Sequence, residues 1–220
     1  MCSRTPSDES RGSEEEGHGN AVPLQSLPIE AMTSIPTLET PRLWLKPAEL
    51  ADAERLQTVF PQWEIVKYLN AKVPWPYPPD GAITFLREIA LPAMEAGKEL
   101  LWMLRPKSSP ELLIGAISLC PSQGDASREE HRGFWIDPKW GRQGLMTEAC
   151  EAVTDYWFGV LKEPVLRAPK AIANEGSRRI SERQGMRVIS RCDREYVSGR
   201  LPSEIWEITA EDWRARKRRL

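Results

Sequence analysis

The sequence predicts an α+β fold in a single domain, and two observations carry that prediction. The first is length, because 220 residues are enough for one well-buried core and favour one domain over two. The second is the order of hydrophobic patterns after residue 37, where strand-like alternation and helix-like spacing follow one another. The order is a strand, helices, three strands, a helix, a strand, a helix and a closing strand pair.

The first 33 residues differ in composition from the rest of the chain. They carry six acidic residues against two basic ones, and few large apolar residues precede Val22. Such a segment cannot bury enough apolar surface to order itself. We therefore expect a disordered acidic tail over residues 1–33 and one domain over residues 34–220.

The first half of the domain is expected to be mostly helical after one strand. Leu43 and Leu45 lie on one face of that strand, and apolar residues at spacings of three then indicate a helix. The prolines near residue 75 exclude a helix or a central strand, because proline has no amide donor. The expected elements are a strand at 43–45, helices over 48–60, 62–69 and 81–97 with an interruption at Pro92, and a rigid loop over 73–79.

The second half alternates strands and helices. Two apolar runs are separated by the turn-rich segment 105–110, which is typical of a hairpin. The expected strands cover 100–104, 112–119, 132–136 and 165–172, with a closing pair at 187–190 and 205–209, and the expected helices cover 145–158 and 177–184.

Composition excludes several classes of protein. The net charge is −2, and without the tail, whose two basic and six acidic residues give −4, the remaining chain carries +2, too small a positive charge to indicate a nucleic-acid partner. No apolar run approaches the roughly 18 residues of a membrane span. Four scattered cysteines without CxxC spacing indicate neither a zinc site nor a disulfide framework. With only two histidines, a hydrolase triad or a histidine-rich metal site is hard to build. We expect a cytoplasmic protein without a secretory signal, a metal or a membrane partner.

The segment from Phe134 to Ala149 is the most informative part of the chain. It combines a predicted strand, a glycine-bearing turn and the start of a long helix. Main-chain amides at a helix start are unpaired and carry a partial positive charge, so such a turn can hold a phosphate. Acidic residues are absent between Lys139 and Thr147, which favours an anion, although the same pattern also occurs where a chain simply reverses direction. The Walker and Rossmann glycine patterns are absent.

Part of this segment resembles the pyrophosphate loop of GNAT-superfamily N-acetyltransferases. The branch that it resembles is the ribosomal-protein alanine N-acetyltransferase (Rim) type. The matching residues are 137–149, Asp-Pro-Lys-Trp-Gly-Arg-Gln-Gly-Leu-Met-Thr-Glu-Ala. Residues 174–180 and 184–186 are similar to that branch's Asn-x-x-Ser helix and the Gly-Met that follows it. The resemblance covers residues 37 to 210. One departure is Arg142, which stands where the family usually has glycine.

The resemblance implies a mixed, mostly antiparallel sheet flanked by helices, in which strands 132–136 and 165–172 run parallel and splay apart. Acetyl-coenzyme A would lie between the diverging strands as cosubstrate. A main-chain amide near Ile136 would stabilise the oxyanion of the tetrahedral intermediate. The residues implied to bind it are Ile136, Gly141, Arg142, Gln143, Gly144, Leu145, Met146, Thr147, Asn174 and Ser177.

The resemblance also implies that Ser177 protonates the departing thiolate, although Asn174 and Ser177 would equally suit a helix cap. Glu130 and His131 are candidates for the base by placement alone, and each could instead be a solvated loop residue. Trp75 and Tyr77 would wall the acceptor site, or pack over the edge of the core.

The expected activity is transfer of acetyl to a primary amine, either a protein N-terminus or a small molecule. The chain would act as a monomer or a homodimer. Two alternatives stay open: a non-catalytic GNAT-like module that senses acyl-coenzyme A, motivated by Arg142 and the missing base, and a scaffold that has lost the site.

Overall fold

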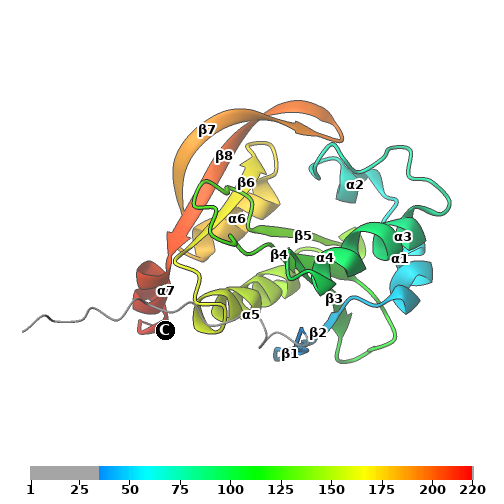
Figure 1. The fold of residues 1–220 in the computed structure, drawn as a ribbon, viewed down its shortest axis with the longest axis horizontal. Coiled ribbons are helices and arrows are strands. Elements are labelled where there is room, and N and C mark those ends of the chain that lie inside the picture. Colours follow the sequence, from blue (N-terminus) through cyan, green and yellow to red (C-terminus); the bar gives the residue numbers. More distant parts are fainter. Residues whose placement is uncertain (1–34, 220) are drawn as a thin grey trace, which may run out of the picture. The chain divides into compact units, whose positions relative to one another are not determined.

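The computed structural model describes residues 35–219. The acidic tail predicted over residues 1–33 lies outside the described residues. Within the described part, no helix is both long enough and apolar enough to cross a bilayer. The helices and strands confirm the predicted α+β class, and they build two antiparallel sheets (Figure 1).

The first sheet contains five strands in the order in which they occur in the chain, each antiparallel to its neighbour. The strand predicted at 43–45 is confirmed as β2, and a two-residue strand, β1, precedes it. Strand β3 is almost wholly buried, because helices cover both faces of the sheet at this point. The strands are β1 (Leu38–Glu39), β2 (Leu43–Pro47), β3 (Leu100–Pro106), β4 (Gly115–Leu119) and β5 (Arg132–Ile136).

Short helices between β2 and β3 cover one face of this sheet. They bury Leu56, Ile65 and Leu86 against Met103 and Ala116 of the sheet. The helical stretch predicted over 81–97 is confirmed, but it contains a wide π-helical turn just before Pro92 instead of a break at that proline. The elements are η2 (Leu50–Asp52), α1 (Ala53–Val59), α2 (Trp63–Val66), α3 (Gly81–Thr84), η3 (Phe85–Ala90) and α4 (Leu91–Glu95).

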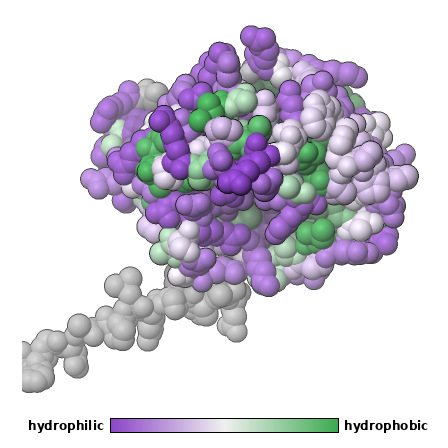
Figure 2. Space-filling view, turned by 90° about the horizontal axis from the view of Figure 1, so that it is seen from above, coloured by the Kyte–Doolittle hydropathy of each residue, from purple (hydrophilic) through white to green (hydrophobic). Residues whose placement is uncertain are grey.

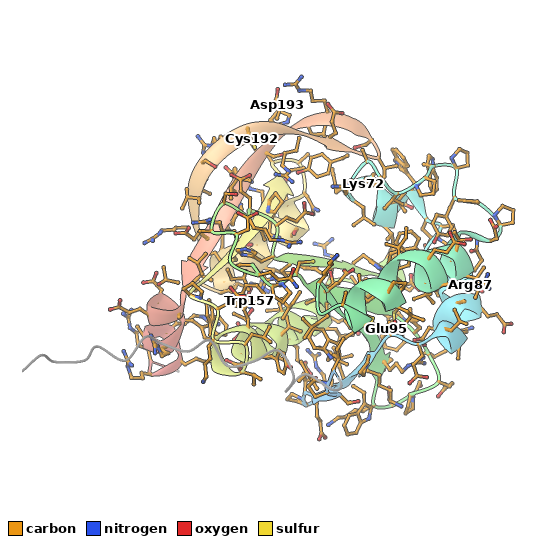
Figure 3. All side chains as sticks on the ribbon, in the orientation of Figure 1. Lys72, Arg87, Glu95, Trp157, Cys192 and Asp193 are labelled. Atoms are coloured by element: carbon orange, nitrogen blue, oxygen red, sulfur yellow. The ribbon has the colours of Figure 1, made fainter. Side chains whose placement is uncertain are left out.

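The opposite face is covered by α5 (Leu145–Gly159), which follows the short helix η4 (Pro138–Trp140). The inward side of α5 includes Ala149, Val153 and Trp157, all fully buried in the larger hydrophobic core. Trp157 lies in the interior of the molecule, where its Nε1 donates to the carbonyl of Val165 at 3.0 Å (Figure 3). This contact ties α5 to the second sheet.

The second sheet has three antiparallel strands in the order β6-β8-β7. The closing pair predicted over 187–190 and 205–209 is much longer than expected, because polar residues between 191 and 204 continue both strands. Figure 1 shows this hairpin arching from α7 toward α2, where Val197 N–H donates to the carbonyl of Leu69. The elements are β6 (Val165–Ala171), α6 (Glu175–Arg183), β7 (Arg187–Tyr196), β8 (Gly199–Thr209) and α7 (Ala210–Lys217).

The face seen from above the hairpin is mostly hydrophilic, and its apolar residues form separate small areas (Figure 2). Strand β7 is exposed along most of its length, which explains why its sequence lacks the apolar alternation of a half-buried strand.

Candidate functional site

The two sheets meet where β5 and β6 begin. The N–H of His131 donates to the carbonyl of Arg167 at 3.0 Å, and the N–H of Arg167 donates to Nδ1 of His131 at 2.9 Å. Beyond these two bonds the strands belong to different sheets and no longer pair with each other. The two parallel strands therefore touch at one end and diverge toward the other, as expected from the sequence.

Main-chain groups of β5 face the space between the diverging strands. Asp137 N–H donates to the carbonyl of Ile114, the residue just before β4, and alternate residues of a strand direct their amides to opposite sides. The amides of Trp135 and Gly133 therefore face β4, while those of Phe134 and Ile136 face β6. Within residues 35–219 these two amides have no partner, and they lie along one wall of the gap, close to the position predicted for the oxyanion donor.

The gap between β5 and β6 opens into a cleft with a volume of about 550 Å³. Strands β5 and β6, the starts of α5 and α6, α2 and the end of β7 supply its walls. Most of the residues predicted to bind the cosubstrate line it: Ile136, Gly141, Arg142, Gly144, Leu145, Met146, Thr147, Asn174 and Ser177.

One end of the cleft combines an uncapped helix start with arginine side chains. Gly144 precedes α5 with φ +80°, and no side chain caps the helix. The amides of its first turn, Leu145 to Thr147, therefore point out of the helix without an intrahelical partner. The guanidinium-bearing residues Arg142, Arg179 and Arg183 line the same cleft. Amides and cations together suit a diphosphate.

A brace from the first sheet holds this loop in place. Arg42 donates through Nη1 to the carbonyl of Gln143 at 2.9 Å and through Nε to Glu148 at 2.7 Å. Thr40 and the main-chain amide of Arg42 also donate to the Glu148 carboxylate. Burial acts to raise the pKa of Glu148, but these hydrogen bonds and the Arg42 charge outweigh it and lower that pKa. Glu148 therefore stays ionised and paired beside the helix start.

Arg142 adopts a backbone conformation that normally requires glycine. Its φ is +61°, in the left-handed region, which costs an L-residue roughly 1 to 2 kcal/mol. At this position the family usually has glycine. The loop of this chain keeps the backbone conformation of a glycine, and the arginine adds a guanidinium to the wall of the cleft.

Replacing Arg142 with glycine should raise the free energy of unfolding by about 0.5 to 1 kcal/mol, because the backbone strain is relieved. The same change should weaken binding of coenzyme A, because a cation is lost from the cleft. Denaturant titration and calorimetry measure the two effects. Lys162→Gly is the matched control, since Lys162 has φ +58° and does not line the cleft. It should gain stability without losing affinity, and an unstabilised Arg142→Gly would contradict the strain argument.

Asn174 and Ser177 take different positions on α6. The helix begins at Glu175, earlier than predicted, and the Asn174 side chain caps it by accepting from the Ser177 amide at 3.2 Å. Asn174 is thus a helix cap as well as a cleft residue. The Ser177 hydroxyl is not the cap, and among the described residues it has no hydrogen-bond partner at that helix start.

Glu130 and His131 separate although they are adjacent in the chain. Glu130 lines the cleft and pairs with Arg194 at 3.1 Å. His131 does not line the cleft, because its ring is buried beside Trp157 and its Nδ1 is occupied by the Arg167 amide. Burial, with Arg128 and Arg167, lowers the pKa of His131 to about 4. The structure therefore gives His131 the role of joining the sheets, not that of a base in the cleft.

Three further predicted residues do not line the cleft. Trp75 lies against Trp63 with the ring centroids 5.6 Å apart, and Tyr77 packs edge-on to Phe60. Burial raises the pKa of Tyr77 to about 12. Tyr77 thus packs against the edge of the core, while Trp75 is partly exposed and contacts the equally exposed Trp63. Gln143 contributes its carbonyl to Arg42, and its side chain donates to the Lys139 carbonyl instead of entering the cleft.

The cleft also contains charged residues that sequence reasoning missed. Arg132 and Lys170 are buried at its inner end, and Glu64 and Glu195 line its outer part with Glu130. A lysine inside the apolar run of β6 was the available signal for Lys170. Cations thus lie at the loop and inner end, whereas the carboxylates of Glu64 and Glu195 come from α2 and β7, and Arg194 of β7 pairs with Glu130.

Comparison with known proteins agrees with this geometry. Residues 42–187 match the family model described as an acetyltransferase (GNAT) domain. A probable N-acetyltransferase of Bacillus subtilis, YjcK, is 35% identical over 78 residues, which span 36% of this chain and 43% of that protein.

Solved structures share the fold at low sequence identity. The ribosomal-protein-S5-alanine acetyltransferase of Vibrio fischeri is 14% identical with a TM-score of 0.69, covering 81% of this chain and 99% of its own. Mycobacterium smegmatis RimJ, solved with a coenzyme A disulfide, is 17% identical with a TM-score of 0.67, covering 80% and 87%. Because the family model spans well over half of the sequence, this chain belongs to the GNAT acetyltransferase family.

Proposed function

We propose that the chain transfers an acetyl group from acetyl-coenzyme A to a primary amine by direct attack in a ternary complex. One observation carries the proposal: the unpaired amides at the start of α5 and the unpaired amides of β5 line a single cleft. The first set suits a diphosphate, and the second suits the amide groups and the thioester carbonyl of the pantetheine arm. Mycobacterium smegmatis RimJ, which shares the fold and was solved with a coenzyme A disulfide, supplies the precedent for this cosubstrate.

In this proposal the residues of the cleft act mainly by position and charge. The α5 amides and Arg142 hold the phosphates, and the Phe134 and Ile136 amides orient the thioester and stabilise negative charge on its oxygen. Good orientation alone can supply roughly 7 to 11 kcal/mol of the barrier. The carboxylates of Glu64, Glu130 and Glu195 attract a cationic amine to the opposite side of the cleft.

Among these carboxylates, Glu130 is the candidate for accepting the amine's proton, directly or through water, since it lines the cleft with almost half of its side chain exposed. His131 is no longer a candidate because its accepting nitrogen is occupied. The acceptor class that we favour is a protein N-terminus, with a small-molecule amine as the other source. Similarity of fold to acetyltransferases of ribosomal proteins supports it.

A screen of small amines and short peptides with different N-terminal residues, followed by release of the coenzyme A thiol, tests this proposal. We expect release to depend on a free α-amine. The matched control is the same peptide with its N-terminus blocked. Equal release from free and blocked peptides would contradict transfer to the terminal amine.

The alternative is a module that binds acyl-coenzyme A without turnover, and the strained Arg142 is the observation that favours it. Calorimetry with acetyl-coenzyme A distinguishes the two. Binding without thiol release for any amine would support the sensor, and absence of binding would contradict both.

A further inference from the structure

Lys170 is a buried lysine at the inner end of the cleft, and the proposed mechanism does not use it. It lies on β6 with its side chain on the same face as Leu166 and Ala168, which belong to the core beneath α5. The residue is only 4% exposed, yet it lines the cleft. Its Nζ lies 4.8 Å from the centroid of the Phe134 ring across the gap.

The register of the two strands places Lys170 opposite one of the unpaired amides of β5. His131 pairs with Arg167 where the strands touch, so three residues further along, Phe134 on β5 lies opposite Lys170 on β6. The Phe134 amide is one of the two unpaired donors that face the gap. A carbonyl bound there would bring its attached sulfur close to the side of the cleft that Lys170 occupies.

Carboxylates near Lys170 are engaged by other cations. Glu204 lies directly opposite it on β8, but Arg178 and Arg191 bind the Glu204 carboxylate at 3.0 and 3.3 Å. Glu130 pairs with Arg194. Among the described residues, Lys170 forms no ion pair of its own, which is costly for a buried ammonium. The Lys170 ammonium is therefore available to pair with an anion that forms in the cleft.

Arg132 adds a second buried cation at the same end of the cleft. It is 3% exposed, its guanidinium donates to the Thr154 hydroxyl at 2.8 Å, and its Nε has no partner among the described residues. Burial lowers the pKa of Lys170 to about 7; Arg132 acts in the same direction, while Cys150 and Glu130 oppose it. An ammonium of this acidity can give its proton to a thiolate, whose conjugate thiol has a pKa of about 8.5.

We propose that Lys170 is a further catalytic residue, whose ammonium faces the departing sulfur, stabilises the thiolate and transfers a proton to it. The inference rests on the proposed function. The amine nitrogen forms a bond to the carbonyl carbon, the carbon–sulfur bond breaks, and its electron pair goes to sulfur. The cationic acceptor loses one proton to Glu130 or water before it attacks as a neutral amine, and its nitrogen loses a second proton to solvent after the new bond forms. Lys170 donates one proton to the sulfur, and solvent reprotonates Lys170.

The test uses coenzyme A itself, with its free thiol, and needs no acceptor. The ultraviolet absorbance of the thiolate is followed against pH for the bound ligand in the wild type and in Lys170→Met, which keeps the length of the side chain. A nearby ammonium lowers the pKa of the thiol, so we expect the thiolate fraction at neutral pH to be at least about tenfold larger in the wild type.

Two further variants make the result specific. Lys170→Arg keeps the charge and should restore the thiolate signal, which a merely space-filling role would not do. Lys46→Met, at an exposed position of β2, should behave as the wild type. Equal thiolate titration in the wild type and Lys170→Met, with coenzyme A bound to both, would overturn the inference and leave the proposed function intact. Failure of the wild type to bind coenzyme A would instead overturn the proposed function.

Discussion

Gly144→Glu should weaken binding of coenzyme A and acetyl-coenzyme A by roughly a thousandfold. The substitution places a carboxylate where the amides of the α5 start face the cleft, and juxtaposed like charges cost several kcal/mol, with about 1.4 kcal/mol per tenfold in affinity. The new side chain would also meet Arg42, since a Cβ at position 144 lies 3.4 Å from its Nη2. Calorimetric titration measures the loss.

Backbone strain must be separated from this effect, because Gly144 has φ +80° and any other residue there is strained. Gly97→Glu is the matched control: Gly97 has φ +65°, and a Cβ there meets nothing within 4 Å. Both variants should lose similar stability, on the order of 1 kcal/mol, but only Gly144→Glu should lose affinity. Unchanged affinity in Gly144→Glu would place the diphosphate elsewhere.

The sequence predicted the loop and helix of this site well because their signals are local. A glycine before an apolar helix, with acidic residues absent from the turn, depends only on the conformation and charge of neighbouring residues. The predicted bounds of β5 and the start of α5 therefore agree with the structure.

Side-chain roles that depend on contacts between distant segments were harder to predict. His131 follows Glu130 in the chain, yet its ring turns into the core because the Arg167 amide, on another strand, supplies its partner. The Arg42 brace of the loop joins residues about 100 positions apart. Neither contact can be predicted from the local pattern of apolar and polar residues.

The β7–β8 hairpin was underestimated for a related reason. Its outer strand is exposed and paired on one side, so its residues need not alternate between apolar and polar. Cross-strand pairing holds β7 through main-chain bonds that are independent of side-chain type. Hydrophobic periodicity indicates only the 187–190 end of this strand, where Val188 and Ile189 are apolar although they are exposed.

Ser177→Ala should lower kcat by roughly 10- to 10⁴-fold if its hydroxyl donates to the departing sulfur, with little change in affinity for acetyl-coenzyme A. The structure removes the competing explanation by lost capping, since Asn174 caps α6 and Ser177 supplies only its main-chain amide. Little change in the free energy of unfolding is therefore expected. Steady-state kinetics with an acceptor from the amine screen, together with denaturant titration, measure the two quantities.

Ser181→Ala provides the matched control on the same helix. Ser181 is one turn further along α6, and its hydroxyl is fully buried without a hydrogen-bond partner among the described residues. Its removal should leave kcat unchanged and should not destabilise the fold, because no hydrogen bond is lost. Wild-type kcat in Ser177→Ala would exclude Ser177 from proton transfer.

The same kinetics connect Ser177 with Lys170. A serine hydroxyl is too weak an acid to supply protons by itself. The Lys170 ammonium, with a pKa of about 7, is acidic enough to do so. If Ser177 only relays a proton that Lys170 supplies, Ser177→Ala should reduce kcat but leave the thiolate titration of bound coenzyme A as in the wild type. Lys170→Met should change both. A change of the thiolate titration in Ser177→Ala as large as that in Lys170→Met would assign the stabilisation of sulfur to the hydroxyl instead.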